Sequence, residues 1–207
     1  MRSGLSETDA DADPLRQFER WLEDAARAGL PLPNAMTLAT AAAGKPSARV
    51  VLLKNIEREG FVFYTNYRSR KALELEANAA ACLVFLWSEL ERQVRVEGRV
   101  EKVSPADSDA YFATRPLGAR LSAWASAQSE RVGDRTVLEQ ALEEARRRYG
   151  AEPPRPPHWG GYRLIPDEIE FWQGRADRLH DRLLYARGGS SAAGGAAQGW
   201  RIERLAP

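Results

Sequence analysis

The feature that most constrains the fold is a change in the spacing of apolar residues near position 35. Before it, Leu15, Phe18 and Leu22 recur at helical spacing, behind an Asp13-Pro14 pair that is typical of a helix start. After it, short apolar runs separated by turn-forming residues predict strands at 35–41, 48–55, 61–66, 80–87, 93–103, 162–165, 169–173, 183–186 and 200–205. Further helices are expected at 68–77, 104–114, from 116 and at 136–149. Because helices and strands do not alternate regularly, the pattern argues against a doubly wound sheet and predicts a mainly β (α+β) fold, a barrel-like core with peripheral helices.

The length and composition fit one domain. A chain of 207 residues with 43% apolar and 29% charged residues is typical of a single globular unit. The polar residues 1–12 are expected to form a disordered tail, so that the domain spans 13–207. Within it, the low-complexity stretch 188–199 (GGSSAAGGAAQG) predicts a flexible loop between the last two strands.

Charge and motifs argue against several classes of function. With 30 Lys and Arg against 29 Asp and Glu, the chain lacks the basic excess of a protein that coats nucleic acid. Its apolar stretches are shorter than the ~18 residues of a membrane span, and the N-terminus carries no secretory signal, so a cytoplasmic protein is expected. One cysteine and two distant histidines argue against a metal site. The sequence has no GxGxxG, P-loop or GxSxG motif.

Basic residues stand at the ends of one predicted strand and at the start of a predicted helix. Arg49 and Lys54 flank the apolar run 50–53, and in a regular strand they would point to opposite faces. Arg70 and Lys71 follow Ser69, the expected N-cap, where cations oppose the helix dipole. A phosphate bound at this helix start would explain them. Solvated surface cations are the commoner explanation for such a pair on its own.

Two further groups combine charge with aromatic or imidazole rings. Tyr111 and Arg115 share a helix face, which suits phosphate recognition but also simple packing of the arginine stem on the ring. If 178–182 is extended, Arg178, His180 and Arg182 lie on one face, where an anionic ligand or nearby carboxylates would offset their repulsion. Both groups are therefore candidates for an anion site.

Four neutral residues could contact a flat heteroaromatic ligand. Gln93, Gln128 and Ser129 can hydrogen-bond the edge of such a ring, and Trp172 could cover its face. Ordinary surface polarity and core packing explain each of them better when it is taken alone.

Longer motifs carry a resemblance that spans nearly the whole chain. They are RVVLLK (49–54), FYTNYRSRK (63–71), LERQVRVEG (90–98), YFATRP (111–116), AWASAQS (123–129), WGGYRL (159–164), EFWQGRADRLHDR (170–182) and RLAP (204–207). In these motifs the chain closely resembles the pyridoxine/pyridoxamine 5'-phosphate oxidase family. The resemblance implies an FMN-binding split β-barrel and an obligate homodimer that holds FMN at the subunit interface.

The resemblance also implies a role for each matching residue. The FMN site would comprise Arg49, Val50, Val51, Leu52, Leu53, Lys54, Tyr64, Thr65, Arg70, Lys71, Gln93, Gln128, Ser129, Trp172 and Arg182. The substrate site would comprise Lys54, Tyr111, Arg115, Arg178, Leu179 and His180, with Arg178 and His180 as catalytic residues that orient the substrate. The implied reaction, part of vitamin B6 biosynthesis and salvage, oxidises pyridoxine and pyridoxamine 5'-phosphates to pyridoxal 5'-phosphate. Dioxygen would be the acceptor and hydrogen peroxide the second product.

Two positions depart from the family pattern. Ala119 stands where the family usually has a serine among its phosphate contacts, and losing that donor costs about 1 kcal/mol unless Ser122, Arg120 or water replaces it. No Arg-x-x-Tyr segment precedes Gly4-Leu5, where the family often has an arm that covers the substrate. Both departures concern the substrate, not the flavin.

Two alternatives to the oxidase stay open. A related flavin or deazaflavin reductase would keep the barrel and change the substrate or the electron partner. A non-catalytic protein would bind flavin or pyridoxal phosphate without turnover.

Overall fold

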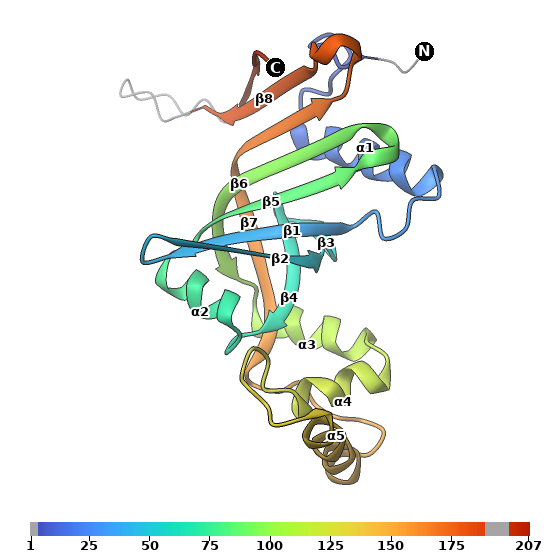
Figure 1. Cartoon of the computed structure of the whole chain (residues 1–207), viewed down its shortest axis with the longest axis vertical. Coiled ribbons are helices and arrows are strands. Elements are labelled where there is room, and N and C mark those ends of the chain that lie inside the picture. Colours follow the sequence, from blue (N-terminus) through green and yellow to red (C-terminus); the bar gives the residue numbers. More distant parts are fainter. Residues whose placement is uncertain (1–3, 189–198) are drawn as a thin grey trace.

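The structure is a computed structural model that describes residues 4–188 and 199–207. Over these residues every strand pairing is antiparallel, and one sheet runs in the order β2-β1-β5-β6-β7-β4-β3, extended by β8 and β9 beside β7 (Figure 1). The strands are β1 (Ala35–Ala42), β2 (Lys45–Leu52), β3 (Asn55–Glu57), β4 (Gly60–Asn66), β5 (Ala80–Trp87), β6 (Arg92–Lys102), β7 (Trp159–Gln173), β8 (Asp181–Arg187) and β9 (Trp200–Arg204). The helices are α1 (Pro14–Arg27), α2 (Arg70–Ala77), α3 (Pro105–Thr114), α4 (Leu117–Ala125) and α5 (Arg135–Tyr149). The prediction of a mainly β fold with peripheral helices is confirmed.

Strand β7 is the longest strand of the described residues and connects the two ends of the molecule. Along one edge it pairs with β6; along the other it pairs first with β4 and then with β8. The sequence predicts two strands here because Pro166 interrupts the apolar pattern. The chain keeps one strand because the register shifts by one residue between Glu97 and Gly98, opposite Pro166. A Cβ at Gly98 would lie 2.0 Å from the Ile165 carbonyl oxygen, so the shift requires glycine.

The main core lies between α1 and the sheet. Phe18 of α1 makes edge-to-face contacts with Phe61 and Phe85, at centroid distances of 5.0 and 4.7 Å. Trp21, one turn further along, packs edge-on against Phe171 of β7. The apolar spacing that predicts the first helix is therefore the spacing with which α1 covers the sheet.

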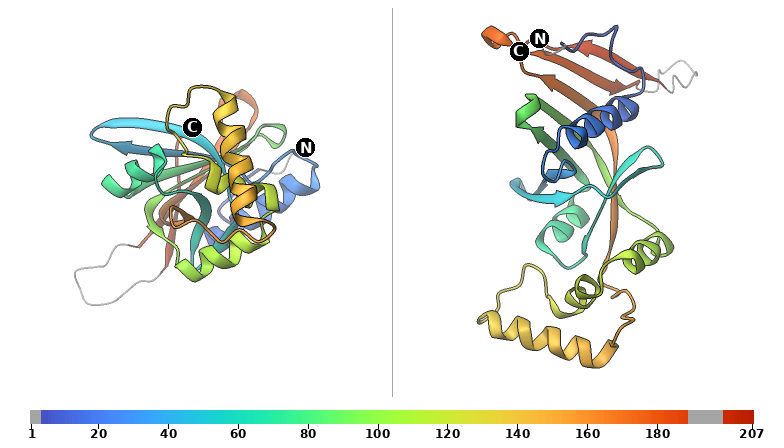
Figure 2. Two further views of the ribbon diagram at one scale, coloured as in Figure 1. Left: turned by 90° about the horizontal axis from the view of Figure 1, so that it is seen from below. Right: turned by 90° about the vertical axis from the view of Figure 1, so that its right-hand side faces the viewer.

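Figure 2 shows α5 at one end of the long axis and the C-terminal strands at the other. At the α5 end, Trp124 of α4 stacks on Tyr149 of α5 with ring centroids 4.5 Å apart. At the opposite end, β8 and β9 extend the sheet beyond the barrel. Among the helices of residues 4–188 and 199–207, none is long and apolar enough to cross a membrane.

Residues 4–12 differ from the disordered tail that their polarity predicts. They form turns against the C-terminal strands, where Leu5 is 6% exposed and its backbone N–H donates to Asp181. Arg204 of β9 donates to the Leu5 carbonyl and to the Glu7 carboxylate. The buried leucine and these charged contacts order the segment, and they are long-range contacts that a local pattern does not reveal. Residues 1–3 lie outside the described residues.

Two further segments bear on the sequence predictions. Strand β3 lies where the sequence predicts the end of one strand and a turn, and it pairs with β4 through Ile56 and Phe61. The predicted loop 188–199 lies outside the described residues except for its terminal glycines, of which Gly188 donates to the Gly199 carbonyl at 3.0 Å.

Candidate functional site

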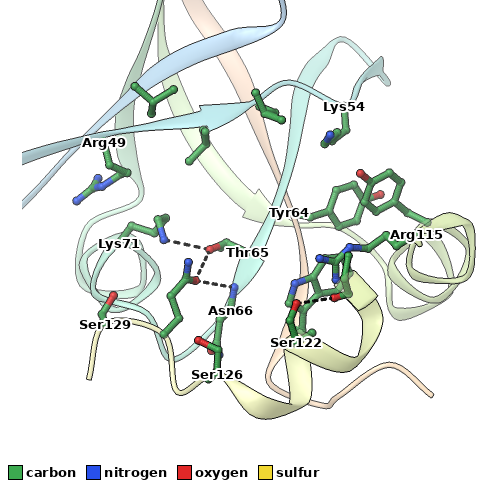
Figure 3. A pocket seen from close by; sticks show the side chains of 18 of the residues that line it. Arg49, Lys54, Tyr64, Thr65, Asn66, Lys71, Arg115, Ser122, Ser126 and Ser129 are labelled. Atoms are coloured by element: carbon green, nitrogen blue, oxygen red, sulfur yellow. Dashed lines mark hydrogen bonds between the residues drawn. The ribbon is translucent and has the colours of Figure 1, made fainter. Parts of the chain in front are cut away.

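A cavity of about 1050 Å³ opens beside β2, β4 and the first turn of α2, and is closed on the other side by α3, α4 and the segment after α4 (Figure 3). It collects thirteen of the predicted site residues: Arg49, Val50, Val51, Leu52, Lys54, Tyr64, Thr65, Arg70, Lys71, Tyr111, Arg115, Gln128 and Ser129. These residues come from segments up to 80 positions apart, and the barrel brings them to one place.

One side of the cavity is a cluster of cations at the start of α2. The Lys71 side chain is 7% exposed, and its Nζ donates to Thr65 Oγ1 at 3.1 Å and to Ser69 Oγ at 3.3 Å. Burial, followed by the nearby charge of Arg49, lowers the pKa of Lys71. Since a bound anion would stabilise the charged lysine, this pair suits a phosphate.

Ser129 caps α2 in place of the predicted Ser69. Ser69 occupies the N-cap position, but its side chain makes no capping hydrogen bond. Ser129 Oγ accepts from the Arg70 backbone N–H at 3.1 Å, with Ser129 in the left-handed region at a φ of 76°. Such a conformation costs a non-glycine residue about 1–3 kcal/mol and is typical of binding sites. Beside it, Gln128 Oε1 accepts from Thr65 Oγ1 at 3.1 Å, which joins this segment to β4.

Arg49 and Lys54 both line the cavity, whereas a regular strand would point them to opposite faces. Strand β2 ends at Leu52, and Lys54 lies in the link to β3, where the alternation of side chains no longer holds. The Lys54 backbone N–H donates to the Val62 carbonyl at 2.9 Å, which fixes the link against β4. Leu53, expected at the flavin, is 4% exposed and packs in the core instead.

The other side of the cavity is aromatic. The rings of Tyr64, Tyr111 and Trp159 lie nearly parallel to one another, with the Tyr64 centroid 3.9 Å from Tyr111 and 5.4 Å from Trp159. A Cβ at Gly161 would lie 2.8 Å from the Tyr64 ring, so the stack requires a glycine there. Burial raises the pKa of Tyr64 to about 12, which keeps its hydroxyl neutral.

Arg115 lies on this aromatic surface with unused hydrogen-bonding capacity. Its guanidinium carbon is 4.5 Å from the centroid of the Trp159 ring. Its Nη1 is buried and finds no hydrogen-bond partner among the described residues. Burial also lowers the pKa of Arg115. A buried cation with a free N–H fits an anionic ligand, because the ligand would supply both the missing partner and the missing charge.

The remaining predicted residues lie outside this cavity, on β6, β7 and β8 and in the loop before β8. They are Gln93, Trp172, Arg178, Leu179, His180 and Arg182. Three of them are neighbours across the sheet, since Gln93 of β6 pairs with Trp172 of β7, and Trp172 pairs with Arg182 of β8. Arg182 Nε donates to Glu170 at 2.7 Å. Figure 1 shows β8 at the opposite end of the molecule from α3 and α4, which close the cavity.

Residues 178–182 do not meet the condition of an extended segment, under which Arg178, His180 and Arg182 would share one face. Ala176–Arg178 form a 3₁₀ turn in which Asp177 and Arg178 have left-handed φ values of 56° and 60°, and β8 begins at Asp181. The turn is closed by the Arg175 backbone N–H, which donates to His180 Nδ1 at 3.1 Å. Because Nδ1 accepts this bond, the neutral ring carries its proton on Nε2. The His180 ring lies 4.6 Å from Trp172.

Among the cavity residues that the sequence reasoning does not single out are Asn66, Ser126 and Trp159. Asn66 and Ser126 are polar residues in a strand end and a loop, without a pattern that separates them from ordinary surface positions. Trp159 could have been identified from the sequence, because two glycines follow it, and a glycine in a strand often marks a place where other groups pack closely.

The antiparallel strands, with a cavity that combines clustered cations and an aromatic surface, fit the class of split-barrel flavoproteins that the sequence resemblance implies. Two family models cover most of this chain. Residues 22–149 match pyridoxamine 5'-phosphate oxidase, and residues 159–207 match the pyridoxine 5'-phosphate oxidase C-terminal dimerisation region. The chain belongs to the pyridoxamine 5'-phosphate oxidase family.

Relatives and solved structures agree with this membership. The chain is 58% identical to the pyridoxine/pyridoxamine 5'-phosphate oxidase of Burkholderia vietnamiensis, over 100% of this chain and 94% of that one. It is 61% identical to the same enzyme of Cupriavidus necator, over 98% and 93%. The structure of PhzG from Burkholderia lata, in complex with tetrahydrophenazine-1-carboxylic acid, superimposes with a TM-score of 0.89 at 33% identity, covering 98% of both chains. An FMN-binding protein from Nostoc punctiforme has the same fold, with a TM-score of 0.73 at 19% identity, over 95% of this chain and 100% of that one.

Family membership confirms three expectations that the sequence resemblance raises. The protein is an oxidoreductase, its cofactor is FMN, and its C-terminal region serves dimerisation. The cavity fits this cofactor on independent grounds, because it offers buried cations for a phosphate and apolar β2 side chains for a flat ring.

Proposed function

We propose that this protein oxidises pyridoxine 5'-phosphate and pyridoxamine 5'-phosphate to pyridoxal 5'-phosphate, with dioxygen as the acceptor and hydrogen peroxide as the second product. One observation carries the proposal beyond the names of the relatives. The cavity has two separate sets of cations, Arg49 with Lys71 on one side and Lys54 with Arg115 on the other (Figure 3). Two phosphorylated ligands, a cofactor and a substrate, would use both sets.

The FMN phosphate is assigned to the first set. Arg49, Arg70 and Lys71 supply the positive charge, and the Ser129 segment closes the site from the other side. The exposed Val50 side chain and its neighbours in β2 would contact the isoalloxazine ring of a bound FMN. When bound, FMN supplies a two-electron acceptor; the protein supplies position and charge.

The substrate phosphate is assigned to the second set. Arg115 offers its buried free Nη1, Lys54 adds charge, and Tyr111 borders the site from α3. Ala119 also lines the cavity and contributes no side-chain donor. Ser122 does not replace that donor in this structure, because its hydroxyl donates to the Ala119 carbonyl at 3.1 Å. Substrate binding would therefore depend more heavily on Arg115 than in family members that have a serine at the position of Ala119.

The catalytic residues are assigned to the second subunit of the dimer. Arg178 and His180 lie in the loop before β8, at the opposite end of the molecule from α3 and α4 (Figure 1), and they belong to the segment that matches the dimerisation region. A subunit that docks its C-terminal strands beside this cavity would bring them to the substrate, together with Gln93, Trp172 and Arg182. Arg178 would then orient the substrate by its charge, and His180 could donate a hydrogen bond from Nε2.

The test is anaerobic addition of pyridoxine 5'-phosphate to the purified yellow protein, followed by admission of oxygen. Bleaching of the flavin absorption, recovery of the colour and release of one peroxide per turnover are expected. If neither pyridoxine nor pyridoxamine phosphate bleaches the flavin, the proposal fails. Tight binding of pyridoxal phosphate without turnover would then favour the non-catalytic binder. Bleaching by tetrahydrophenazine-1-carboxylic acid instead, the ligand of the PhzG structure, would favour a changed substrate.

A further inference from the structure

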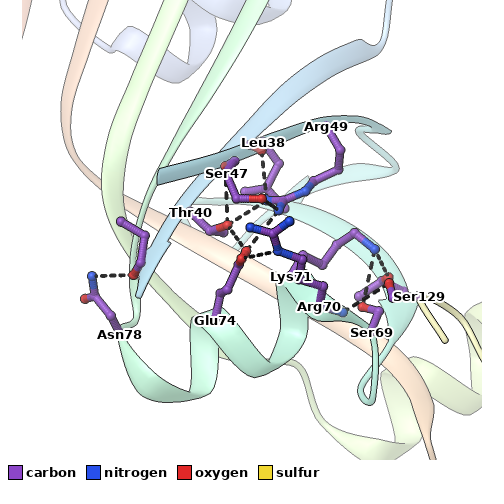
Figure 4. A network of polar contacts seen from close by, with 12 residues as sticks. Leu38, Thr40, Ser47, Arg49, Ser69, Arg70, Lys71, Glu74, Asn78 and Ser129 are labelled. Carbon is purple, nitrogen blue, oxygen red and sulfur yellow. Dashed lines mark hydrogen bonds and ion pairs between the residues drawn. The ribbon is translucent and has the colours of Figure 1, made fainter. Parts of the chain in front are cut away.

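A carboxylate lies among the cations at the start of α2. Glu74 Oε2 accepts hydrogen bonds from Arg49 Nη2 at 2.9 Å and from Thr40 Oγ1 at 2.6 Å. Its other oxygen, Oε1, accepts from Arg70 Nε at 2.8 Å (Figure 4). Glu74 thus joins two arginines that line the cavity, although it does not line the cavity itself.

Glu74 is charged in this setting. Burial opposes its ionisation, but hydrogen bonds from Thr40, Arg70 and Arg49 outweigh burial and lower the pKa of Glu74. Its negative charge also counteracts the effect of burial and of Arg49 on the Lys71 ammonium. The carboxylate therefore helps to keep three cations close together without a ligand.

The charge of this cluster matches a phosphate monoester. Arg49, Arg70 and Lys71 with one carboxylate leave two net positive charges, and a phosphate monoester carries about 1.5 to 2 negative charges at pH 7. Position matters as well as charge, because the Arg70 side chain is 66% exposed. A long side chain at such a position loses conformational freedom when it binds a ligand, and an anchor reduces that cost.

We propose that Glu74 is a positioning residue for the cofactor phosphate, an inference that rests on the proposed function of the cavity. Glu74 holds the guanidinium groups of Arg49 and Arg70 beside Lys71, so that all three face one phosphate before it arrives. It touches neither cofactor nor substrate, and it acts through the two arginines.

The test compares FMN with riboflavin, which has the same ring system and lacks the phosphate. The full-length protein is stripped of flavin and titrated with each compound, and binding is followed by flavin fluorescence. In Glu74→Ala we expect the Kd of FMN to rise about tenfold, the loss of one charge-assisted contact, while the Kd of riboflavin changes less than twofold. Glu74→Gln keeps the size and places an amide N–H against Arg70, so the same selective loss is expected even if the alanine variant folds poorly. Glu76→Gln, an exposed carboxylate on the same helix, is the matched control and should bind both compounds as wild type does.

Several outcomes would overturn the role of Glu74. Equal weakening of FMN and riboflavin in the Glu74 variants would show a purely structural role. Tighter FMN binding in the Glu74 variants would show that net charge, and not position, governs the site. If the wild-type protein binds riboflavin as tightly as FMN, the phosphate assignment under the proposed function fails as well. A wild type that prefers FMN with unaffected Glu74 variants overturns the role of Glu74 alone.

Discussion

Two regions differ in how the chain holds their side chains. One is the cavity wall, formed by β2, β4, the start of α2 and the segment after α4, and the other is the C-terminal loop that connects β7 to β8. At the wall, Lys71, Arg49 and Gln128 are fixed by hydrogen bonds to neighbours within the same subunit. In the loop, Arg178 has a left-handed backbone and the next residue, Leu179, is 71% exposed. Under the proposed function, both phosphate sites of the cavity lie within one chain, and the C-terminal residues would join them on dimerisation.

The loop is exposed, but both of its ends are fixed. Asp181 accepts hydrogen bonds from the Leu5 backbone N–H at 3.1 Å and from Arg204 at 2.8 Å, and Arg175 lies 3.3 Å from its carboxylate. The left-handed backbone conformations at 177 and 178 cost about 1–3 kcal/mol each in folding free energy, and the contacts of Asp181 must offset that cost. A strained turn on a fixed base can present Arg178 and His180 in one orientation.

The largest effect is expected at the cavity's aromatic side. Replacing Arg115 by Ala removes a buried cation that would pair with the substrate phosphate, and kcat/KM for pyridoxine 5'-phosphate should fall about 100-fold, the value of a buried charged contact near 3 kcal/mol. Steady-state peroxide release measures it, and FMN content should not change. Arg135→Ala, in an exposed ion pair on α5, is the control. A loss of FMN in Arg115→Ala would show that the two cation sets do not serve separate ligands.

The next effect tests the loop. Arg178→Ala should slow anaerobic flavin reduction by about 10- to 30-fold, since one charged contact to the substrate is worth roughly 1.5–2 kcal/mol. Stopped-flow absorbance measures the rate, and the flavin should stay bound. Arg201→Ala, an exposed arginine of β9, should behave as wild type. If Arg178→Ala both released flavin and reduced it slowly, the loop would also hold the cofactor, which would contradict its separate role in orienting the substrate.

A smaller effect is expected for Arg70, and it concerns FMN binding instead of flavin reduction. Because its side chain is largely exposed, Arg70→Ala should weaken FMN binding about 3- to 10-fold, in keeping with a partly solvated charged contact. Reduction of the flavin that remains bound should proceed at the wild-type rate. Equilibrium dialysis followed by single-turnover kinetics separates the two. Arg68→Ala, an exposed residue outside the cavity, is the matched control. If Arg70→Ala and Arg178→Ala changed FMN binding and the rate of flavin reduction equally, the cavity wall and the C-terminal loop would not have separate roles.

The smallest effect concerns the contact between Glu7 and Arg204, which holds the N-terminal segment against β9. A hydrogen bond from Arg204 lowers the pKa of Glu7 from its ordinary value of 4.5 to about 2. Because the pKa is lower in the folded protein, the stabilisation is fully present above about 4.5 and is lost as the pH falls to about 2. Glu7→Gln should therefore lower the melting temperature slightly at pH 7, and the difference from wild type should vanish near pH 2. Glu19→Gln on α1 is the control; a difference that persists at pH 2 would mean that the Glu7 charge is not involved.

The sequence predicts the cavity wall better than the loop for a physical reason. Arg70 and Lys71 at a helix start form a local pattern whose geometry follows from helix periodicity, and Tyr111 lies in the last turn of α3, which Arg115 follows directly as the C-cap. The turn at Ala176–Arg178 has no such pattern, because an imidazole nitrogen of His180 closes it instead of a glycine or proline.

Long-range partners were out of reach of sequence reasoning for a related reason. Glu74 meets Arg49 and Thr40 only because α2 packs beside the β1–β2 hairpin. Residues 4–12 look disordered by composition, yet Leu5 finds a buried position beside β8 and β9. The antiparallel fold itself was predictable, since the alternation of apolar residues specifies strands and the turn residues mark their ends.

Strand β7 carries residues of both regions, with Trp159 at the aromatic side of the cavity and Trp172 in the C-terminal sheet. In the proposed dimer, each β7 would thus serve its own cavity at one end and its partner's at the other. A strand rises about 3.3 Å per residue, so roughly 40 Å separate the two tryptophans. In that arrangement, the length of β7 would set the distance between the two flavin sites. Inserting or deleting a residue in it would move both active sites at once.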